Sequence, residues 1–389
     1  MIRSAERLAH LPPYPFAGWS REVAAVAARG VDVIRLDIGN PDLPPPAPVI
    51  GALEQSARDP HHHGYPGYRG LPALREAIAG YYRRRFDVDL DPHRQVLPLL
   101  GSKEGIVNLA LACLDPGDVV LVPDPGYPAY ALGAALAGAS IVPIRLLPEQ
   151  GYLPDLDAIP AELAGRATLM WLNYPHNPTG ATADLRFLAR AVDFARQHRL
   201  LLCHDTPYCD VTYDGYLAPS LLQVPGAADL AVEFNSFSKS WNMAGWRVGM
   251  AVGNAQALDA LAQVKSNVDS GIFRPLQEAA VQALATDSDW VHERNQVYQA
   301  RRDLILTHLA AAGISAARPQ ATLYVWARVP ASASSESWAL ELLHTTGVAV
   351  APGSFFGPGG EGFVRLSVTA PTDRIRTAMT RLGRDAVLP

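Results

Sequence analysis

The chain has 389 residues, of which 49% are hydrophobic and 18% charged, a balance typical of a folded globular protein rather than a disordered one. Its formal net charge of -5 argues against a nucleic-acid-binding surface, which needs clustered positive charge. Its three cysteines, Cys113, Cys203 and Cys209, are too few and too scattered for a disulfide framework or a zinc site, and no apolar run approaches the ~18 to 20 residues of a membrane span.

The N-terminal segment lacks the apolar region of a signal peptide, which predicts a cytoplasmic protein. The prolines of LPPYPFA, the segment that contains Tyr14, favour an extended arm over a helix. A helix is expected from Ser20 to Ala28, with Ser20 as its N-cap. The strand DVIRLDIG then ends at Gly39, which either serves a plain turn or lets the backbone come close to a ligand.

The next segments combine polar loops with a glycine turn. The three histidines at 61–63 cannot all face one metal ion in regular structure, so we interpret them as part of a polar loop that also contains Tyr65. In VLPLLGSKEGIVNLALACL, Gly101, Ser102 and Lys103 lie where a strand passes into a helix. Unpaired N–H groups and the helix dipole favour a phosphate at such a position, although many helices begin this way with nothing bound.

Polar and aromatic residues follow three successive strands. Tyr127 lies in the loop after the strand in DVVLVPDPGYPAY, where its ring could stack on a flat cofactor or fill the core. Asn173 and Asn177 follow the strand ATLMWLN, and such asparagines either cap turns or bind a cofactor. The strand LLLCHD ends at Asp205, with Tyr208 three residues later. A buried acid needs a partner, and a protonated pyridine nitrogen would be one.

The segment NSFSKSWNMAGWRVGM, residues 235–250, places Ser236 and Ser238 beside Lys239, with Arg247 eight residues further on. A partly desolvated lysine near other cations loses its proton and becomes a Schiff-base nucleophile. The serines and the arginine could bind the phosphate of an aldehyde cofactor. The alternative is a solvated lysine in a polar turn.

The remaining segments complete the predicted fold. Strands that alternate with helical patterns predict a mostly parallel sheet with right-handed crossovers. Asn267 lies at the end of a helix, and residues 275–312 have helical periodicity that predicts two helices. The C-terminal part is predicted to be α+β, with Arg365 in a strand, where it either faces solvent or pairs with a carboxylate in a cleft.

These motifs together resemble the class I/II aminotransferases of fold type I, over nearly the whole chain. Within that class, the sequence is most similar to the LL-diaminopimelate aminotransferase-like branch, as judged from LPPYPFA, GSKEG, PDPGYPAY, NYPHNPTG, VKSNVDSG and GWRVGMAVGN. The resemblance implies an α/β fold with a large domain, built on a mostly parallel doubly wound sheet, and a smaller α+β domain. It places an N-terminal arm and part of the small domain at 1–40, the large domain at 41–275 and the small domain at 276–389.

The resemblance also implies a cofactor, pyridoxal 5′-phosphate (PLP), and the residues that bind it. Lys239 would form the Schiff base, and Asp205 would pair with the ring nitrogen and keep the ring an electron sink. Tyr208 and Asn177 would bind the phenolic oxygen and lower the pKa of the Schiff base, while Tyr127 would stack on the ring. The phosphate would be held at the glycine turn and at the lysine motif, by Gly101, Ser102, Lys103, Ser236, Ser238 and Arg247.

Substrate contacts and a subunit partner are implied in the same way. Arg365 would bind the substrate α-carboxylate, helped by the backbone of Gly39, while Tyr127 and Asn177 would also face the substrate. Tyr65 would reach the phosphate of a neighbouring subunit, so that a homodimer shares its active sites. Three further positions lie near the substrate in that branch: Tyr14, Lys103 and Asn267.

The expected activity is transfer of an amino group between an amino acid and a 2-oxo acid, with LL-diaminopimelate and 2-oxoglutarate as a candidate pair. Alternatives are broad use of alanine, aspartate or aromatic donors, or a redirected reaction such as β-elimination, decarboxylation or oxidation. A PLP-binding transcription regulator would need an added DNA-binding domain, for which the aminotransferase pattern leaves too little chain. Thr206-Pro207 departs from the family pattern, because a proline there stiffens the loop that carries Tyr208.

Overall fold

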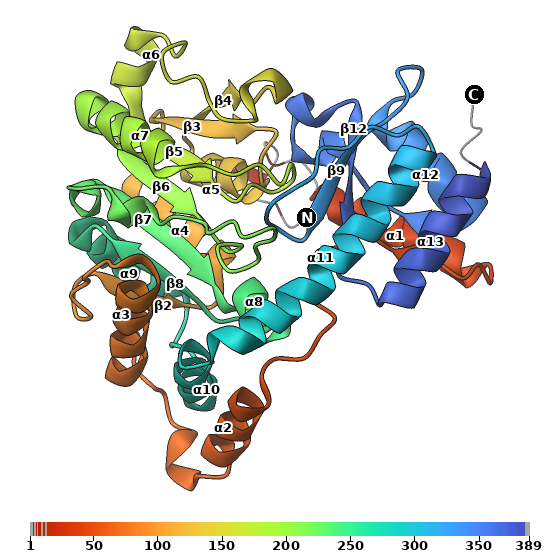
Figure 1. Ribbon diagram of the computed structural model, residues 1–389. Coiled ribbons are helices and arrows are strands. Elements are labelled where there is room, and N and C mark those ends of the chain that lie inside the picture. The colour runs from red at the N-terminus through yellow and green to blue at the C-terminus, as the bar shows by residue number, and fades with distance from the viewer. Residues whose placement is uncertain (1–2, 4, 6, 9–10, 12–13, 386–389) are drawn as a thin grey trace.

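A seven-stranded sheet forms the centre of the computed structural model, which describes residues 3, 5, 7–8, 11 and 14–385 (Figure 1). Its strand order is β2-β8-β7-β6-β5-β3-β4, and all neighbouring pairs are parallel except those that β8 makes with β2 and β7. The predicted mostly parallel sheet is therefore confirmed. The strands are β2 (Val96–Leu99), β3 (Val119–Asp124), β4 (Ser140–Arg145), β5 (Ala167–Asn173), β6 (Leu201–Asp205), β7 (Ala231–Ser236) and β8 (Gly249–Gly253).

Helices cover both faces of this sheet, because alternate residues of each strand point to opposite faces. In β5, Met170 and Leu172 belong to one hydrophobic cluster, with residues of α3 (Pro72–Phe86), α7 (Leu185–His198) and α10 (Arg274–Leu284). Leu169 and Trp171 belong to the other cluster, with residues of α4 (Ser102–Cys113), α5 (Ala129–Ala137) and α9 (Ala255–Val268). Further helices are α2 (Ala47–Ala57), α6 (Ala161–Arg166) and α8 (Phe237–Ser240).

A second, antiparallel sheet lies beside the first, with the order β11-β12-β9 (Figure 1). It consists of β11 (Ala351–Pro352), β12 (Phe363–Ser367) and β9 (Tyr324–Arg328). A separate parallel pair joins β1 (Ile34–Arg35) to β10 (Val348–Ala349), so a segment near the N-terminus lies with the C-terminal part. The helices here are α1 (Pro15–Ala28), α11 (Ser288–Ala311), α12 (Ser335–Thr346) and α13 (Thr372–Asp385).

The start of α1 differs from the sequence prediction. The helix begins at Pro15 rather than Ser20, so an extended arm is wrong for residues 15–17, while Pro12 and Pro13 lie outside the described residues. A proline is well suited to the first helical position, because its N–H would be unpaired there in any case and its φ is already helical. Trp19, Val23 and Val26 then form a buried stripe that fixes the helix against the small-sheet core.

The two helices expected in 275–312 are present as α10 and α11. Helix α11 runs diagonally from the neighbourhood of α8 and α10 to α13, and so connects the two sheet regions (Figure 1). Among the helices of the described chain, none is long and apolar enough to span a membrane. The described residues also contain no cluster of three or more histidine, cysteine and acidic side chains that could hold a metal ion.

Candidate active site

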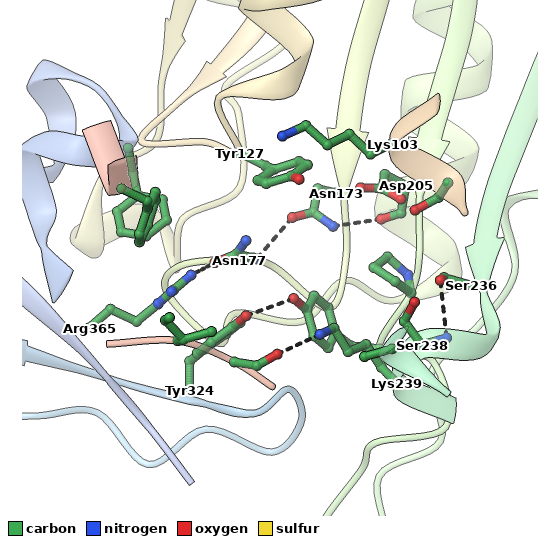
Figure 2. Close-up of a pocket in the computed structure, with 18 of the residues that line it drawn as sticks. Lys103, Tyr127, Asn173, Asn177, Asp205, Ser236, Ser238, Lys239, Tyr324 and Arg365 are labelled. Atoms are coloured by element: carbon green, nitrogen blue, oxygen red, sulfur yellow. Dashed lines mark hydrogen bonds between the residues drawn. The ribbon is translucent and has the colours of Figure 1, made fainter. Parts of the chain in front are cut away.

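A cavity of about 390 Å³ opens where the carboxyl ends of β5, β6 and β7 face the small sheet (Figure 2). Ligands bind at this edge in open α/β sheets. Most of the residues that the sequence nominated line it, from segments spread over the whole chain: Tyr14, Gly39, Ser102, Lys103, Tyr127, Asn177, Asp205, Tyr208, Ser236, Ser238, Lys239, Arg247 and Arg365.

Lys239 lies on the short helix α8, directly after β7. Its Nζ donates a hydrogen bond to the carbonyl oxygen of Gly39, which comes from the loop after β1. Burial, together with the nearby charges of Arg365 and Arg247, lowers the pKa of Lys239 to about 7. A large fraction of the amine is therefore neutral near pH 7, as a Schiff-base nucleophile requires.

Asp205 ends β6 with only 3% of its surface exposed. Its Oδ2 accepts a hydrogen bond of 2.8 Å from the Tyr130 hydroxyl, whereas its Oδ1 has no hydrogen-bond partner among the described residues. Burial raises the pKa of Asp205 to about 7, although the hydrogen bond from Tyr130 and the proximity of His204 oppose this. A buried carboxyl oxygen without a donor suits a cationic N–H group, such as a protonated pyridine nitrogen.

The part of the cavity at the start of α4 is suited to a phosphate. Ser102 is the first residue of α4, and the Gly101 that precedes it has a φ of +83°. A Cβ on Gly101 would lie 2.2 Å from Nη2 of Arg247, so the turn needs glycine to admit the arginine. Arg247 also donates to the Ser238 hydroxyl over 3.3 Å. Free N–H groups at a helix start, hydroxyls and a guanidinium are the groups that bind phosphate.

Arg365 projects from β12 into the cavity, with 4% of its surface exposed (Figure 2). Its Nη1 donates to Oδ1 of Asn177 and its Nη2 to the carbonyl of Asp37, both over 2.7 Å, while its Nε has no partner. It takes part in none of the ion pairs among the described residues. A buried guanidinium with N–H groups to spare and no carboxylate of its own is arranged to bind an anionic ligand.

Lys103 is a further cation in the cavity. Its Nζ lies 4.4 Å from the centre of the Tyr14 ring and 5.8 Å from the centre of the Tyr127 ring. Burial first, and then the charge of Arg247, lower its pKa. No ion pair within the described chain includes Lys103, so its charge also remains available to a ligand.

Tyr208 lines the cavity and is 4% exposed, so Pro207 before it leaves the side chain in the site. Its hydroxyl lies 3.0 Å from that of Tyr324 on β9. Asn173 donates to the carbonyl of Asp205 over 2.6 Å and accepts from the backbone N–H of Asn177 over 2.9 Å. Its side chain therefore stabilises the loop after β5.

Three nominated residues do not line this cavity. Gly101 borders it at the turn directly before Ser102, whereas Tyr65 and Asn267 lie apart from it. Tyr65 lies in the loop before α3 with 90% of its surface exposed. Asn267, near the end of α9, donates its side-chain amide to the carbonyl of Gln263 over 2.8 Å at an exposed position. Their predicted roles stay predictions, and within one chain the structure does not bring them to the site.

Sequence reasoning missed several aromatic residues of the site. Tyr130 holds Asp205, Tyr324 touches both Tyr208 and Arg365, and Phe16 and Phe356 complete the wall. Tyr130 and Tyr324 stand in apolar segments whose pattern indicates core residues. The one sequence signal for these two tyrosines was the hydroxyl itself, since a buried phenol needs a hydrogen-bond partner.

Comparisons with known proteins agree with this geometry. A family model described as aminotransferase class I and II matches residues 31–382. The LL-diaminopimelate aminotransferase of Desulforudis audaxviator is 50% identical over 378 residues, which cover 97% of this chain and 96% of the relative. The one of Moorella thermoacetica is 48% identical, with 98% of each chain covered.

Solved structures are similar over the same length. Substrate-bound BacF from Bacillus subtilis has a TM-score of 0.95 at 36% identity, with 99% of this chain and 98% of that chain covered. Aspartate aminotransferase from Thermus thermophilus with maleate has a TM-score of 0.92 at 30% identity, with 99% and 100% covered. The chain therefore belongs to the class I and II aminotransferases, which use pyridoxal 5′-phosphate to move an amino group between amino acids and 2-oxo acids.

Proposed function

We propose that this aminotransferase takes the amino group of LL-diaminopimelate and passes it to 2-oxoglutarate in two half-reactions at one site. The observation that carries the proposal is near 50% identity, over almost the full length, to relatives that are named LL-diaminopimelate aminotransferases. Two cations that line the cavity, Arg365 and Lys103, support it, because the donor and the acceptor each carry a carboxylate at both ends.

The residues of the cavity fit PLP. Asp205 would bind the ring nitrogen with its unpaired Oδ1, and the cup of Ser102, Ser238 and Arg247 would bind the phosphate. Bound PLP supplies an aldehyde that takes up amines and a ring that accepts electrons. Tyr127 would lie against the ring, and Tyr208 with Asn177 would bind its phenolic oxygen. The phosphate turn at Gly101 and the serine Ser236 at the helix start would complete the cofactor contacts.

Lys239 would act as the base. With a pKa of about 7, its amine is neutral often enough at physiological pH to take the proton from the substrate Cα. The Gly39 carbonyl, which accepts a hydrogen bond from Nζ, would hold the free amine close to that proton. Proton transfer by a positioned side chain contributes typically about 10²- to 10⁴-fold to the rate.

Arg365 and Lys103 would bind the carboxylates at the two ends of a long substrate. Arg365 would bind the α-carboxylate that every donor and acceptor shares, through N–H groups that have no carboxylate partner in the chain. Lys103 would bind the distal carboxylate, beside the ring of Tyr14. Among the described lining residues, Asp205 is the one acidic side chain, so the distal ammonium of LL-diaminopimelate has no acidic partner from the same chain.

This last point supports the further proposal that the enzyme works as a homodimer with shared active sites. The exposed ring of Tyr65 would reach the phosphate of the partner's cofactor, and Asn267 would approach the partner's substrate. The same proposal assigns 1–40 to an N-terminal arm and part of the small domain, 41–275 to the large domain and 276–389 to the small domain. It also includes a cytoplasmic location and a role in lysine biosynthesis.

A donor panel tests the proposed substrate. Purified enzyme with PLP is assayed with LL-diaminopimelate, glutamate, aspartate, alanine and phenylalanine as donors, and with 2-oxoglutarate or pyruvate as acceptor. The proposal predicts a kcat/KM for LL-diaminopimelate at least about tenfold above that for alanine, equivalent to ~1.4 kcal/mol of transition-state binding. A preference for aspartate or for an aromatic donor would contradict it, and ammonia or carbon dioxide as a main product would indicate a redirected reaction.

A further inference from the structure

Tyr324 lies between two groups to which the proposed function gives different tasks. It is the first residue of β9, and its side chain enters the cavity (Figure 2). Its hydroxyl is 3.0 Å from the hydroxyl of Tyr208, and the Cζ of Arg365 lies 4.0 Å from the centre of its ring. One side chain therefore touches both the proposed partner of the cofactor's phenolic oxygen and the proposed carboxylate clamp.

The contact between the two hydroxyls places one proton between Tyr324 and Tyr208, and either oxygen can donate it. Each phenol has one O–H, and among the described residues the Tyr324 hydroxyl has Tyr208 as its hydrogen-bond partner. If Tyr324 donates to Tyr208, the proton of Tyr208 must point elsewhere, and the cavity is the side that Tyr208 lines. A phenol that accepts a hydrogen bond is also a stronger donor, because hydrogen bonds in a chain polarise one another.

The ring contact fixes the guanidinium. Arg365 lies over the ring of Tyr324 and, at 4.6 Å, that of Phe356, so aromatic faces hold its plane. Nε and the N–H groups that do not bond Asn177 or Asp37 stay available to a ligand. The neighbouring Gly39 leaves the room that this arrangement needs. A Cβ there would lie 2.1 Å from the Tyr324 oxygen, so the ring occupies the space that a side chain at 39 would fill.

We propose that Tyr324 is a positioning residue with two separable functions: its hydroxyl directs the Tyr208 proton toward the cofactor, and its ring holds Arg365 for the substrate carboxylate. The inference rests on the proposed roles of Tyr208 and Arg365. It adds a link between them, because Tyr324 contacts both Tyr208, which would bind the cofactor, and Arg365, which would bind the substrate carboxylate.

Two variants separate the functions. Tyr324→Phe removes the hydroxyl and keeps the ring, whereas Tyr324→Leu removes both. The first readout is the pKa of the pH-dependent absorbance of bound PLP, which a hydrogen bond to the phenolic oxygen lowers. The second readout is the Kd of maleate, a dicarboxylate that cannot donate an amino group, measured by calorimetry. Tyr216→Phe is the matched control, since it removes a phenol that donates to the Ala183 carbonyl outside the cavity.

In Tyr324→Phe, the absorbance pKa should rise by about half a unit or more, as expected when a hydrogen bond is lost, while the maleate Kd stays within about twofold. In Tyr324→Leu the maleate Kd should rise about fivefold or more, in the range of a lost cation–π contact. Tyr216→Phe should change neither. An unchanged absorbance pKa in Tyr324→Phe would overturn the hydroxyl function, and equal maleate binding by the two Tyr324 variants would overturn the ring function.

A double-mutant cycle distinguishes positioning from a general loss of structure. If Tyr324 acts on the cofactor through Tyr208, then Tyr208→Phe and Tyr208→Phe/Tyr324→Phe should have the same absorbance pKa. A further rise in the double variant would show that Tyr324 acts by another route and would reject the hydroxyl function. The proposed function fails separately, if the wild-type protein neither binds PLP nor transaminates.

Discussion

Replacing Asp205 with asparagine should stabilise the cofactor-free protein at neutral pH but lower the turnover of the PLP-loaded enzyme. In the cofactor-free protein, burial raises the pKa of Asp205 from 3.8 to about 7. Between these values the unfolded chain has lost the proton while the folded chain keeps it, so the folded state binds more protons and stability falls as pH rises. This loss of folding stability is absent well below pH 3.8 and complete above pH 7.

The full difference is about three pKa units, or about 4 kcal/mol at about 1.36 kcal/mol per unit. Of this, about 3 kcal/mol accumulates between pH 5 and pH 8. With an unfolding entropy of ~2.1 cal/mol/K per residue, the 389 residues give about 0.8 kcal/mol/K, so the change corresponds to about 3 °C in melting temperature.

Differential scanning fluorimetry of cofactor-free protein measures this. The melting temperature of Asp205→Asn relative to wild type should rise by about 3 °C between pH 5 and pH 8, because asparagine cannot ionise. Glu293→Gln, at an exposed position of α11, is the control and should follow wild type at both pH values. With PLP, turnover of Asp205→Asn should fall about a hundredfold or more, as expected when a charge that supports the transition state is lost. A constant difference in melting temperature between pH 5 and pH 8 would refute the reasoning.

The remaining predictions concern four side chains. Lys239→Ala should abolish transamination in a coupled glutamate assay, and near-normal turnover would exclude it as the base. Arg365→Lys should raise KM for every amino acid and 2-oxo acid, because lysine cannot reproduce the bidentate hydrogen bonds of arginine to a carboxylate. An effect on a single substrate would mean that Arg365 binds the substrate side chain instead of the α-carboxylate. Lys103→Gln should cost LL-diaminopimelate about 1 to 3 kcal/mol more in kcat/KM than alanine, and equal losses would remove its role at the distal carboxylate. Mixed dimers of Tyr65→Ala and Lys239→Ala chains should regain activity, since one site per dimer then has both native residues, and no recovery would argue against shared sites.

The sequence predicted those site residues whose burial costs free energy unless they have a partner or a function. Asp205 ends one buried strand and Lys239 lies shortly after another, and an ionisable side chain at such a position needs a partner or a task. Gly101 was nominated at a turn, and the structure supplies the reason in the guanidinium that occupies its Cβ space. The alternation of strands and helices was enough to predict the main sheet.

Other features depend on contacts that periodicity does not encode. Tyr130 and Tyr324 lie in apolar segments, and their roles follow from hydroxyl contacts 75 and 116 residues away in the chain. The start of α1 at Pro15 depends on the stripe that packs against the C-terminal part. Tyr65 and Asn267 lie outside the cavity of their own chain, so their predicted roles depend on the proposed homodimer.

The most direct test of the proposed activity separates its two half-reactions. LL-diaminopimelate is added to the PLP-loaded enzyme without an acceptor, and the products are quantified against the number of chains. We expect one equivalent of 2-oxo acid product and no ammonia or carbon dioxide, followed by one equivalent of glutamate when 2-oxoglutarate is added to the desalted enzyme. Absence of the first equivalent, or release of ammonia or carbon dioxide in its place, would contradict an LL-diaminopimelate aminotransferase.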